Sequence, residues 1–205
     1  MKLLRVRASN YKNCADDFTI DLVAKSKKTS EDKEYELQEI AEELYVFNTA
    51  AFVGKNASGK TSAIELMECA YSILSEFRLE DKHYNYDNVK LEIIFFHENS
   101  IYKYNTVLKE DPNLGSIADF TEQHIYRKKY YKSKVKDIYS EDGFEEILYL
   151  GELPEDTSIV FFVLKKKETR AVYFNCDGEG ADTYRLMFRA MKTYKISREV
   201  LTKVI

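Results

Sequence analysis

The order of hydrophobic and polar residues at the start of the chain predicts a β-hairpin. Leu4, Val6 and Ala8 are separated by charged residues, and a hydrophobic residue at every second position is typical of a strand with one buried face. A second short strand is expected at 18–23. Residues 25–34 are densely charged and contain no large apolar side chain, which predicts an exposed loop.

Two segments before residue 75 have the spacing of amphipathic helices. The apolar residues of 37–44 recur at helical spacing and predict a short helix. A mostly apolar run follows at 45–53 and is expected to form a buried strand. A second helix is predicted over 61–74, where apolar residues three or four positions apart form a stripe that packs on a sheet. The stripe consists of Ala63, Ile64, Met67, Ala70, Tyr71 and Leu74.

From residue 89 the pattern changes to that of an antiparallel sheet, and we expect β structure through about residue 175. Strands predicted at 89–96 and 101–107 flank a polar turn, which is the arrangement of a β-hairpin. Further strands are predicted at 122–131, 147–150, 158–164 and 170–175.

The end of the chain again has the spacing of helices. A helix is predicted from residue 181, with Asp182 as its cap, and a second helix is predicted to start at Ser197. The chain ends at Ile205 inside an unfinished amphipathic pattern, which suggests the boundary of a fragment. The predicted parts are a hairpin with a strand and helix at 1–88, an antiparallel part at 89–175 and a helical part at 176–205.

One motif in this pattern specifies chemistry. Residues 54–61 read G-K-N-A-S-G-K-T and match the phosphate-loop pattern G-x-x-x-x-G-K-[ST] in full. The loop follows the predicted strand at 45–53 and precedes the predicted helix at 61–74, as the motif requires. The chain has only seven glycines, so a chance match at this spacing is rare. We therefore expect an α/β fold of the P-loop NTPase class, with the antiparallel part as a β-rich subdomain.

Each residue type in the loop has a physical reason. Gly54 and Gly59 let the backbone approach an anion, and the loop amides with the helix N-terminus present positive partial charge to the α- and β-phosphates. Lys60 is expected to reach the β- and γ-phosphates, and Thr61 to bind Mg²⁺. Ser62 supplies a second hydroxyl beside the α-phosphate. The predicted nucleotide site is Gly54, Lys55, Asn56, Ala57, Ser58, Gly59, Lys60, Thr61 and Ser62.

Composition excludes several classes of protein in which this loop could occur. A net charge of −4 and a pI near 5.6 give no overall attraction to nucleic acid or membranes. The three cysteines are widely spaced and the three histidines lack metal-ligand spacing, which disfavours a disulfide framework or a structural metal. The N-terminus is too polar for a signal peptide, and no apolar run reaches about 18 residues. We expect a soluble, cytoplasmic protein without a membrane partner.

The rest of the sequence decides which class of phosphate-loop protein fits. A GTPase is disfavoured because no N-K-x-D base-reading motif follows the loop. A self-contained nucleotide kinase is an alternative, but that class places arginine-rich lid residues after the loop helix, and here a β-rich stretch follows. No apolar strand ends in Asp or Asp-Glu, which a hydrolytic site needs to hold Mg²⁺ and polarise water.

Segments 1–13, 18–22 and 50–62 together resemble the start of an ABC-type ATPase head of the SMC, RecF and OLD-like group, with Asn56-Ala57-Ser58 as the discriminating part. The resemblance covers the N-terminal lobe only. It implies ATP and Mg²⁺ as cofactors, a second head as the partner in a homodimer, and a role in DNA repair or phage defence. The family's signature motif, Asp-Glu strand and switch histidine do not occur before Ile205. The resemblance therefore implies hydrolysis of ATP to ADP only after completion by a C-terminal lobe and a second head.

The resemblance also implies roles for residues outside the loop. In such heads the turn after the first strand approaches the nucleotide, which makes Lys12 and Asn13 candidates for contact with phosphate or base. The alternative is that Lys12 is an ordinary turn lysine that is exposed to solvent and contacts no ligand. The family also uses a glutamine near Mg²⁺, and Gln123 is the one candidate after the loop, with an ordinary strand residue as the alternative.

A basic run at 127–136 is a second candidate surface. It combines six cations with tyrosines and contains no acid, a composition suited to contact with a nucleic-acid backbone and to base stacking. The alternative is the solvated face of an exposed strand. A nucleic-acid-binding module that uses this run is a further functional hypothesis, and DNA is the partner that the resemblance favours. The cations are Arg127, Lys128, Lys129, Lys132, Lys134 and Lys136.

Overall fold

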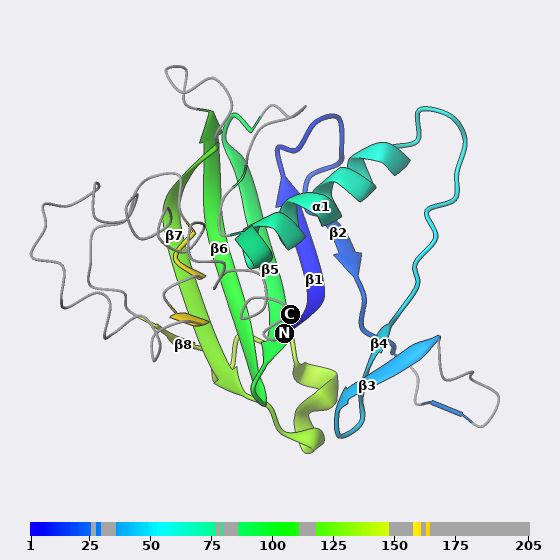
Figure 1. Cartoon of the computed structure of the whole chain (residues 1–205), viewed down its shortest axis with the longest axis vertical. Helices are drawn as coiled ribbons and strands as arrows, with labels where there is room; N and C mark the ends of the chain where they lie inside the picture. Colours follow the sequence, from blue (N-terminus) through cyan, green and yellow to red (C-terminus); the bar gives the residue numbers. More distant parts are fainter. Residues whose placement is uncertain are drawn as a thin grey trace, which may run out of the picture.

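The structure is a computed structural model, and it describes residues 1–25, 28–29, 36–76, 79, 86–110, 118–147, 158–160 and 163–164. Among these residues, the main feature is a six-stranded sheet in the order β2-β1-β5-β6-β7-β8, in which all neighbours are antiparallel (Figure 1). Its strands are β1 (Lys2–Ser9), β2 (Phe18–Asp21), β5 (Val89–His97), β6 (Ser100–Glu110), β7 (Ala118–Lys129) and β8 (Glu145–Glu146).

The other elements lie on the two faces of this sheet. Helix α1 (Lys60–Glu76) crosses one face (Figure 1). The opposite face carries a two-stranded sheet of β3 (Leu37–Ala41) and β4 (Leu44–Phe47), together with the 3-10 helix η1 (Lys132–Asp137). Because β1 pairs with β5, the predicted parts 1–88 and 89–175 share one sheet.

The predicted α/β fold of the P-loop NTPase class is wrong for this chain. That fold requires a parallel sheet, whereas the described strands form antiparallel pairs and only one long helix packs on them. The physical reason lies in the apolar run at 45–53. Its first residues pair with β3 as β4, which ends at Phe47, and residues 49–58 are exposed and belong to no strand. The segment before the phosphate loop thus does not enter the main sheet.

The short helix predicted at 37–44 is also wrong, because these residues form the β3–β4 hairpin. A register shift between Glu39 and Ala41 changes which side chains face inward, so the apolar residues do not alternate strictly. This irregular spacing imitates a helical period. The turn itself places Glu43 at a φ of 61°, which ends any helix there. Backbone bonds from Phe47 N to Leu22 O (2.9 Å) and from Ala24 N to Tyr45 O (3.0 Å) fix the hairpin beside β2.

The predicted loop helix is confirmed, and it supplies one side of the main core. Its buried side chains pack against the sheet residues Phe95, Tyr104 and Ile125. Two members of the predicted stripe, Ile64 and Tyr71, instead lie on the outer side of α1, 56% and 48% exposed. The buried side chains of the helix are Ala63, Leu66, Cys69, Ala70, Ile73 and Leu74.

The remaining strand predictions have mixed outcomes. The first hairpin and the hairpin at 89–107 are confirmed by β1–β2 and β5–β6, and β7 covers most of 122–131. The strand at 158–164 is wrong where it is described, because Val163 N donates to Ile159 O (3.3 Å) in a helical turn. A short apolar run fits either structure. Ile147 follows β8 outside a strand, whereas 148–150, 170–175 and the helices from 181 lie outside the described residues.

The buried thiol of Cys69 predicts a loss of stability in alkali. Burial raises the pKa of this thiol from 9.0 to about 12. Between these values the unfolded chain has lost the proton and the folded chain keeps it, so the free energy of unfolding falls by up to about 1.4 kcal/mol per pH unit. Urea unfolding between pH 7.5 and 10.5 measures this slope. Cys69→Ala should flatten it and Cys14→Ala should not; equal slopes in both variants would contradict the assignment.

Candidate functional site

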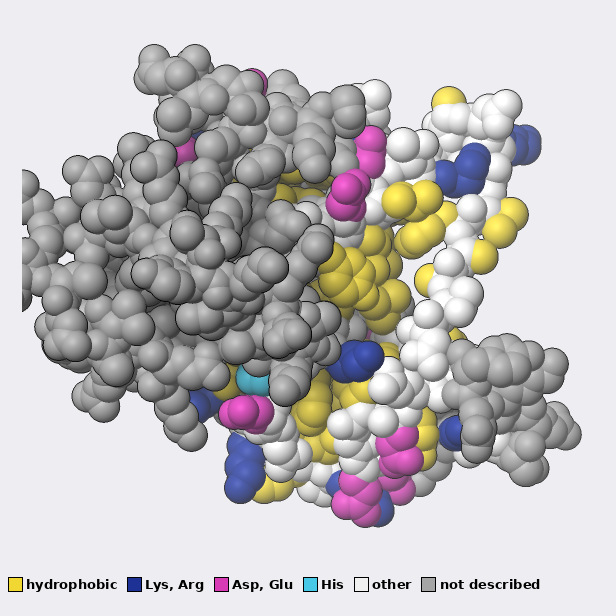
Figure 2. Space-filling model, viewed as in Figure 1, with side chains coloured by type: hydrophobic (Ala, Val, Ile, Leu, Met, Phe, Trp, Pro, Cys, Tyr) yellow, Lys and Arg dark blue, Asp and Glu magenta, His cyan; other side chains and the backbone are white. Residues whose placement is uncertain are grey.

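The phosphate-loop residues lie on an exposed connection between β4 and α1. In the space-filling view this connection stands away from the rest of the described surface (Figure 2). Ser58 N donates to Lys55 O (3.3 Å) in a turn, and Ala63 N donates to Gly59 O (2.9 Å) as the helix begins. The amides before Ala63 are therefore at the open N-terminus of α1, where the helix presents positive partial charge.

The two glycines of the loop differ in how far its conformation requires them. Gly59 has a φ of +85°, a region that side-chain-bearing residues adopt at a cost of about 1 kcal/mol. A Cβ at Gly54 would be 2.5 Å from the Ser58 Oγ, a contact that rotation of the Ser58 hydroxyl can relieve. Ala57 also has a positive φ of 60°. The loop thus turns back on itself, as a phosphate cradle must.

Lys60 closes the loop over its own backbone. Its Nζ donates to the carbonyl oxygens of Gly54 (2.9 Å) and Lys55 (2.6 Å). The ammonium therefore lies at the mouth of the loop, in contact with two neutral acceptors that anionic phosphate oxygens would outcompete. The first turn of α1 contains no acidic residue that would repel an anion. These residues fit a phosphate group.

The two residues with predicted hydroxyl ligands, Thr61 for Mg²⁺ and Ser62 for the α-phosphate, lie in the first turn of α1. Thr61 is exposed in the first turn of α1 next to Lys60, and Ser62 is half-buried beside it. Within the described part of the chain, no group of three or more His, Cys, Asp or Glu side chains can hold a metal ion. A Mg²⁺ ion at Thr61 would therefore take most of its ligands from phosphate oxygens and water, which is its usual coordination beside a nucleotide.

The turn after β1 lies against the first half of α1. Lys12 has a φ of 50° and forms an ion pair with Glu65, and its Nζ is 5.7 Å from the centre of the Tyr11 ring. Glu65 is four residues after Thr61 and so lies on the same side of the helix, one turn further along. The structure thus brings Lys12 beside the loop helix, with Asn13 exposed in the same turn.

Gln123, the candidate from the family's Mg²⁺-site glutamine, is engaged in the core. Its Oε1 accepts hydrogen bonds from Tyr104 Oη (2.6 Å) and from Ile159 N (2.7 Å). Gln123 is on β7, and two strands, β5 and β6, separate β7 from β1. These contacts give Gln123 a structural role, which is to hold the turn at 158–160 on the sheet.

Replacing Gln123 with alanine therefore tests which role it has. The variant leaves the Tyr104 hydroxyl and the Ile159 amide without this acceptor, and we expect a loss of about 1–3 kcal/mol in the free energy of unfolding. Chemical denaturation measures it, with Gln38→Ala as the matched control, since Gln38 is a half-buried glutamine on β3. A Gln123→Ala variant of unchanged stability but altered nucleotide affinity would support the family role instead.

The basic run at 127–136 does not form one continuous surface. Lys128 turns inward, and its Nζ donates to the carbonyl oxygens of Asp137 (3.1 Å) and Ser140 (2.7 Å). Lys132 forms an ion pair with Glu42 in the β3–β4 turn (2.5 Å). Lys136 is exposed on η1. The other three cations, Arg127, Lys129 and Lys134, line a cavity of about 670 Å³ at the end of β7.

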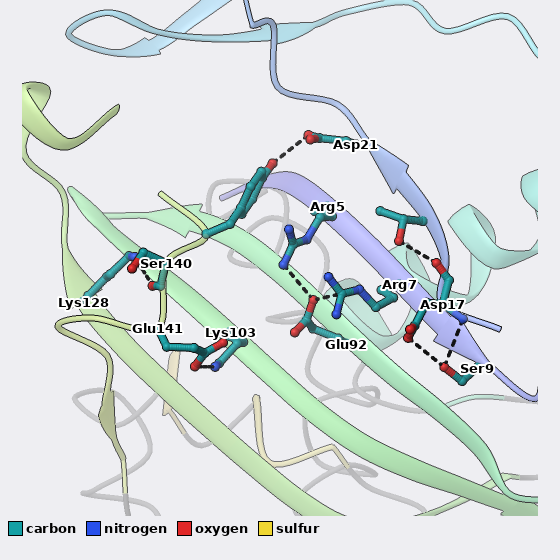
Figure 3. A network of polar contacts seen from close by, with 12 residues as sticks. Arg5, Arg7, Ser9, Asp17, Asp21, Glu92, Lys103, Lys128, Ser140 and Glu141 are labelled. Atoms are coloured by element: carbon teal, nitrogen blue, oxygen red, sulfur yellow. Dashed lines mark hydrogen bonds and ion pairs between the residues drawn. The ribbon is translucent and has the colours of Figure 1, made fainter. Parts of the chain in front are cut away.

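A polar network that the sequence did not reveal covers the face of the sheet opposite α1 (Figure 3). Arg5 Nη2 pairs with Glu92 Oε1 (2.9 Å), and the guanidinium of Arg5 lies 3.9 Å from the centre of the Tyr139 ring. Tyr139 Oη donates to Asp21 (2.7 Å), and burial raises the pKa of Tyr139 well above its ordinary value. Because β1, β2, β5 and the loop after η1 contribute one residue each, no local pattern could have shown this network.

Comparisons with known proteins do not identify a family or a function for this site. The sequence matches no protein-family model, and no curated protein matches it significantly. None of the helices in the described part of the chain has the length and apolar character needed to span a bilayer. The loop at 54–61, the Lys60 ammonium that lies on it and the N-terminus of α1 together form a candidate phosphate-binding site.

Proposed function

We propose that this chain binds Mg²⁺-ATP through the loop at 54–61, as the ATP-binding portion of an ATPase similar in function to the SMC, RecF and OLD-like group. The observation that carries the proposal is the position of Lys60, whose ammonium is held over the loop by the carbonyls of Gly54 and Lys55 at the N-terminus of α1. A triphosphate gives this ammonium charged acceptors in place of neutral ones, which is a stronger interaction.

The loop favours a phosphate ester over other anions. The ammonium of Lys60 lies on the loop beside the open N-terminus of α1, and a cation next to a helix N-terminus suits an anion with several oxygens. The hydroxyl of Thr61 adds a ligand for Mg²⁺, which bridges β- and γ-phosphate oxygens in such sites. ATP supplies both features, and the resemblance of 50–62 to ATPase heads favours adenine over guanine.

Support for a partner that completes the site comes from the charges near the loop. A hydrolytic site needs a carboxylate that polarises the attacking water. The first carboxylate of α1 is that of Glu65, which is paired with Lys12. We therefore assign to another segment or subunit the carboxylate that hydrolysis requires, and expect the chain alone to bind ATP without efficient turnover.

Apolar side chains beside the loop support the same conclusion. Val53, directly before the loop, is 93% exposed, and Phe52 and Ile64 are exposed near it. Soluble monomers rarely leave clustered apolar side chains in water, and such clusters usually mark an interface. A second head or a further lobe that covers this side would bury them while completing the nucleotide site.

Isothermal titration calorimetry tests the proposal directly. We expect the whole chain to bind ATP saturably in the presence of Mg²⁺, more weakly in EDTA, and not to bind adenosine, because the loop contacts phosphates. Adenosine binding as tight as that of ATP, or no ATP binding at millimolar concentration, would overturn the assignment. A steady ATP turnover near the usual enzyme median of about 10 s⁻¹ would leave the binding site intact but refute the composite active site.

A further inference from the structure

We propose that the cavity at the end of β7 is a second binding site, which takes a nucleotide unit of a single-stranded nucleic acid. The cavity has a volume of about 670 Å³ and lies between the β5–β6 turn, the last residues of β7, helix η1 and the loop that follows it. In Figure 1, η1 is at the lower end of the molecule, whereas the phosphate loop joins α1 at the upper end. The two sites are therefore separate.

The loop after η1, which forms one wall of this cavity, is held on the sheet by two lysines. Lys128 ties the loop after η1 to β7 through the carbonyls of Asp137 and Ser140, and its Nζ lies 4.2 Å from the centre of the Phe144 ring. Lys103, buried on β6, forms an ion pair with Glu141 of the same loop (Figure 3). Burial lowers the pKa of Lys128. These two cations are structural, and they fix the shape of the site.

Three further cations line the cavity and are exposed to solvent. Arg127 and Lys129 are on β7, and Lys134 is on η1, so they approach from two elements. Cations on either side of a concave surface can contact successive phosphates of a chain. The net charge of the protein is −4, and four carboxylates balance the four cations of the lining, so attraction to nucleic acid has to come from direct contacts of single cations with phosphates.

An exposed aromatic ring and four carboxylates also line the cavity. Tyr131 is 53% exposed, with the Nζ of Lys129 5.7 Å from the centre of its ring, and it offers a face on which a base can stack. The carboxylates are those of Glu98, Asp137, Asp142 and Glu145. These acids would repel a plain polyanion, but they are acceptors for the amino groups of a base and the hydroxyls of a sugar. Cations, ring and acceptors together fit a nucleotide unit.

Fluorescence anisotropy with labelled dT15 and rU15 tests this site in a Lys60→Ala background, so that the phosphate loop cannot account for binding. The double variant Lys129→Gln, Lys134→Gln should weaken binding at least tenfold and reduce the slope of log K against log salt by about 1.4, which corresponds to two phosphate contacts. The control variant Lys2→Gln, Lys109→Gln changes the charge equally on exposed residues outside the cavity and should leave binding unchanged.

Tyr131→Ala provides a second readout. We expect it to weaken binding about five- to hundredfold with an unchanged salt slope, because stacking is lost and no phosphate contact is. Tyr71→Ala, which removes a tyrosine of similar exposure from α1, should have no effect. Tighter binding of dT15 than of free dTMP supports a nucleic-acid source, and equal affinity for both would make the site one for free nucleotides.

Two results would overturn the proposal. If the cavity and control double variants weaken binding equally, the strand interacts with the whole surface and not with this site. If poly-L-glutamate displaces dT15 at equal charge concentration, the cavity recognises acidic polypeptides instead. Each measurement is made in the Lys60→Ala background. A negative result for the cavity therefore does not bear on the proposed ATP site, and a negative result for ATP binding does not bear on the cavity.

Discussion

Replacing Lys60 with alanine will weaken Mg²⁺-ATP binding by at least a hundredfold. The Lys60 ammonium lies on the loop carbonyls, where the phosphates are expected to bind. A hydrogen bond to a charged partner contributes about 1.5–3 kcal/mol, and two phosphate contacts give about 3 kcal/mol or more, which is a factor of at least 100 in Kd. Calorimetric titration of the variant and the native chain measures the difference.

The same variant should keep the fold. Lys60 contacts only an exposed loop, so we expect the midpoint of thermal unfolding in the absence of nucleotide to change by no more than about 1–2 °C. Lys109→Ala, which removes an exposed lysine from the end of β6, is the matched control and should bind ATP normally. If Lys60→Ala binds as tightly as the native chain, the loop does not hold the phosphates and the proposed function fails.

The sequence predicted those elements whose pattern is local and regular. The strands β1, β5 and β6 and the helix α1 can each be recognised within about ten residues. The phosphate loop was found for the same reason, since its eight residues are contiguous. The expected common face of Leu4, Val6 and Ala8 is wrong, because the register shift after Leu3 places Leu4 in the core on the other face of the sheet. Local pattern is sufficient when an element buries one continuous face.

The fold class could not be read in this way, because it depends on which strands become neighbours. The motif in 54–61 suggested a parallel sheet, but the residues before it pair with β3, and β1 pairs with β5, more than 80 residues further along the chain. Pairing over such distances is decided by the packing of whole faces. In the β3–β4 hairpin, the register shift also interrupts the alternation of apolar and polar residues from which a strand is predicted.

The second candidate site shows the same limit. The basic run at 127–136 was visible in the sequence, but its division into inward and outward cations was not. Lys128 turns inward because the loop after η1 folds over it, and Lys132 is paired with Glu42, about 90 residues earlier in the chain. The sequence does not indicate that Lys103 is buried, because an isolated lysine in an alternating strand usually faces solvent. Only the three-dimensional arrangement separates supporting residues from those that can meet a ligand.

The antiparallel core predicts a large difference between two phenylalanines. Phe95 is fully buried on β5, pairs with Leu3 of β1 and with Tyr102 of β6, and stacks on the Tyr102 ring at 5.1 Å. Phe95→Ala should lower the free energy of unfolding by about 3–5 kcal/mol, because it leaves a cavity between three strands and removes the ring contact. Phe47, at the end of β4, is 47% exposed, and Phe47→Ala should cost about 1 kcal/mol or less.

Urea unfolding followed by circular dichroism measures both effects. A loss of 3–5 kcal/mol is a large share of the 5–15 kcal/mol typical of a domain, so Phe95→Ala is at risk of not folding. Phe95→Leu keeps most of the volume and should cost less than about 1.5 kcal/mol, which keeps the comparison measurable. Similar losses at Phe95 and Phe47 would mean that β5 is not the centre of the core. A difference of 2 kcal/mol or more requires Phe95 to be enclosed on both sides, which is the position that β1 and β6 give it.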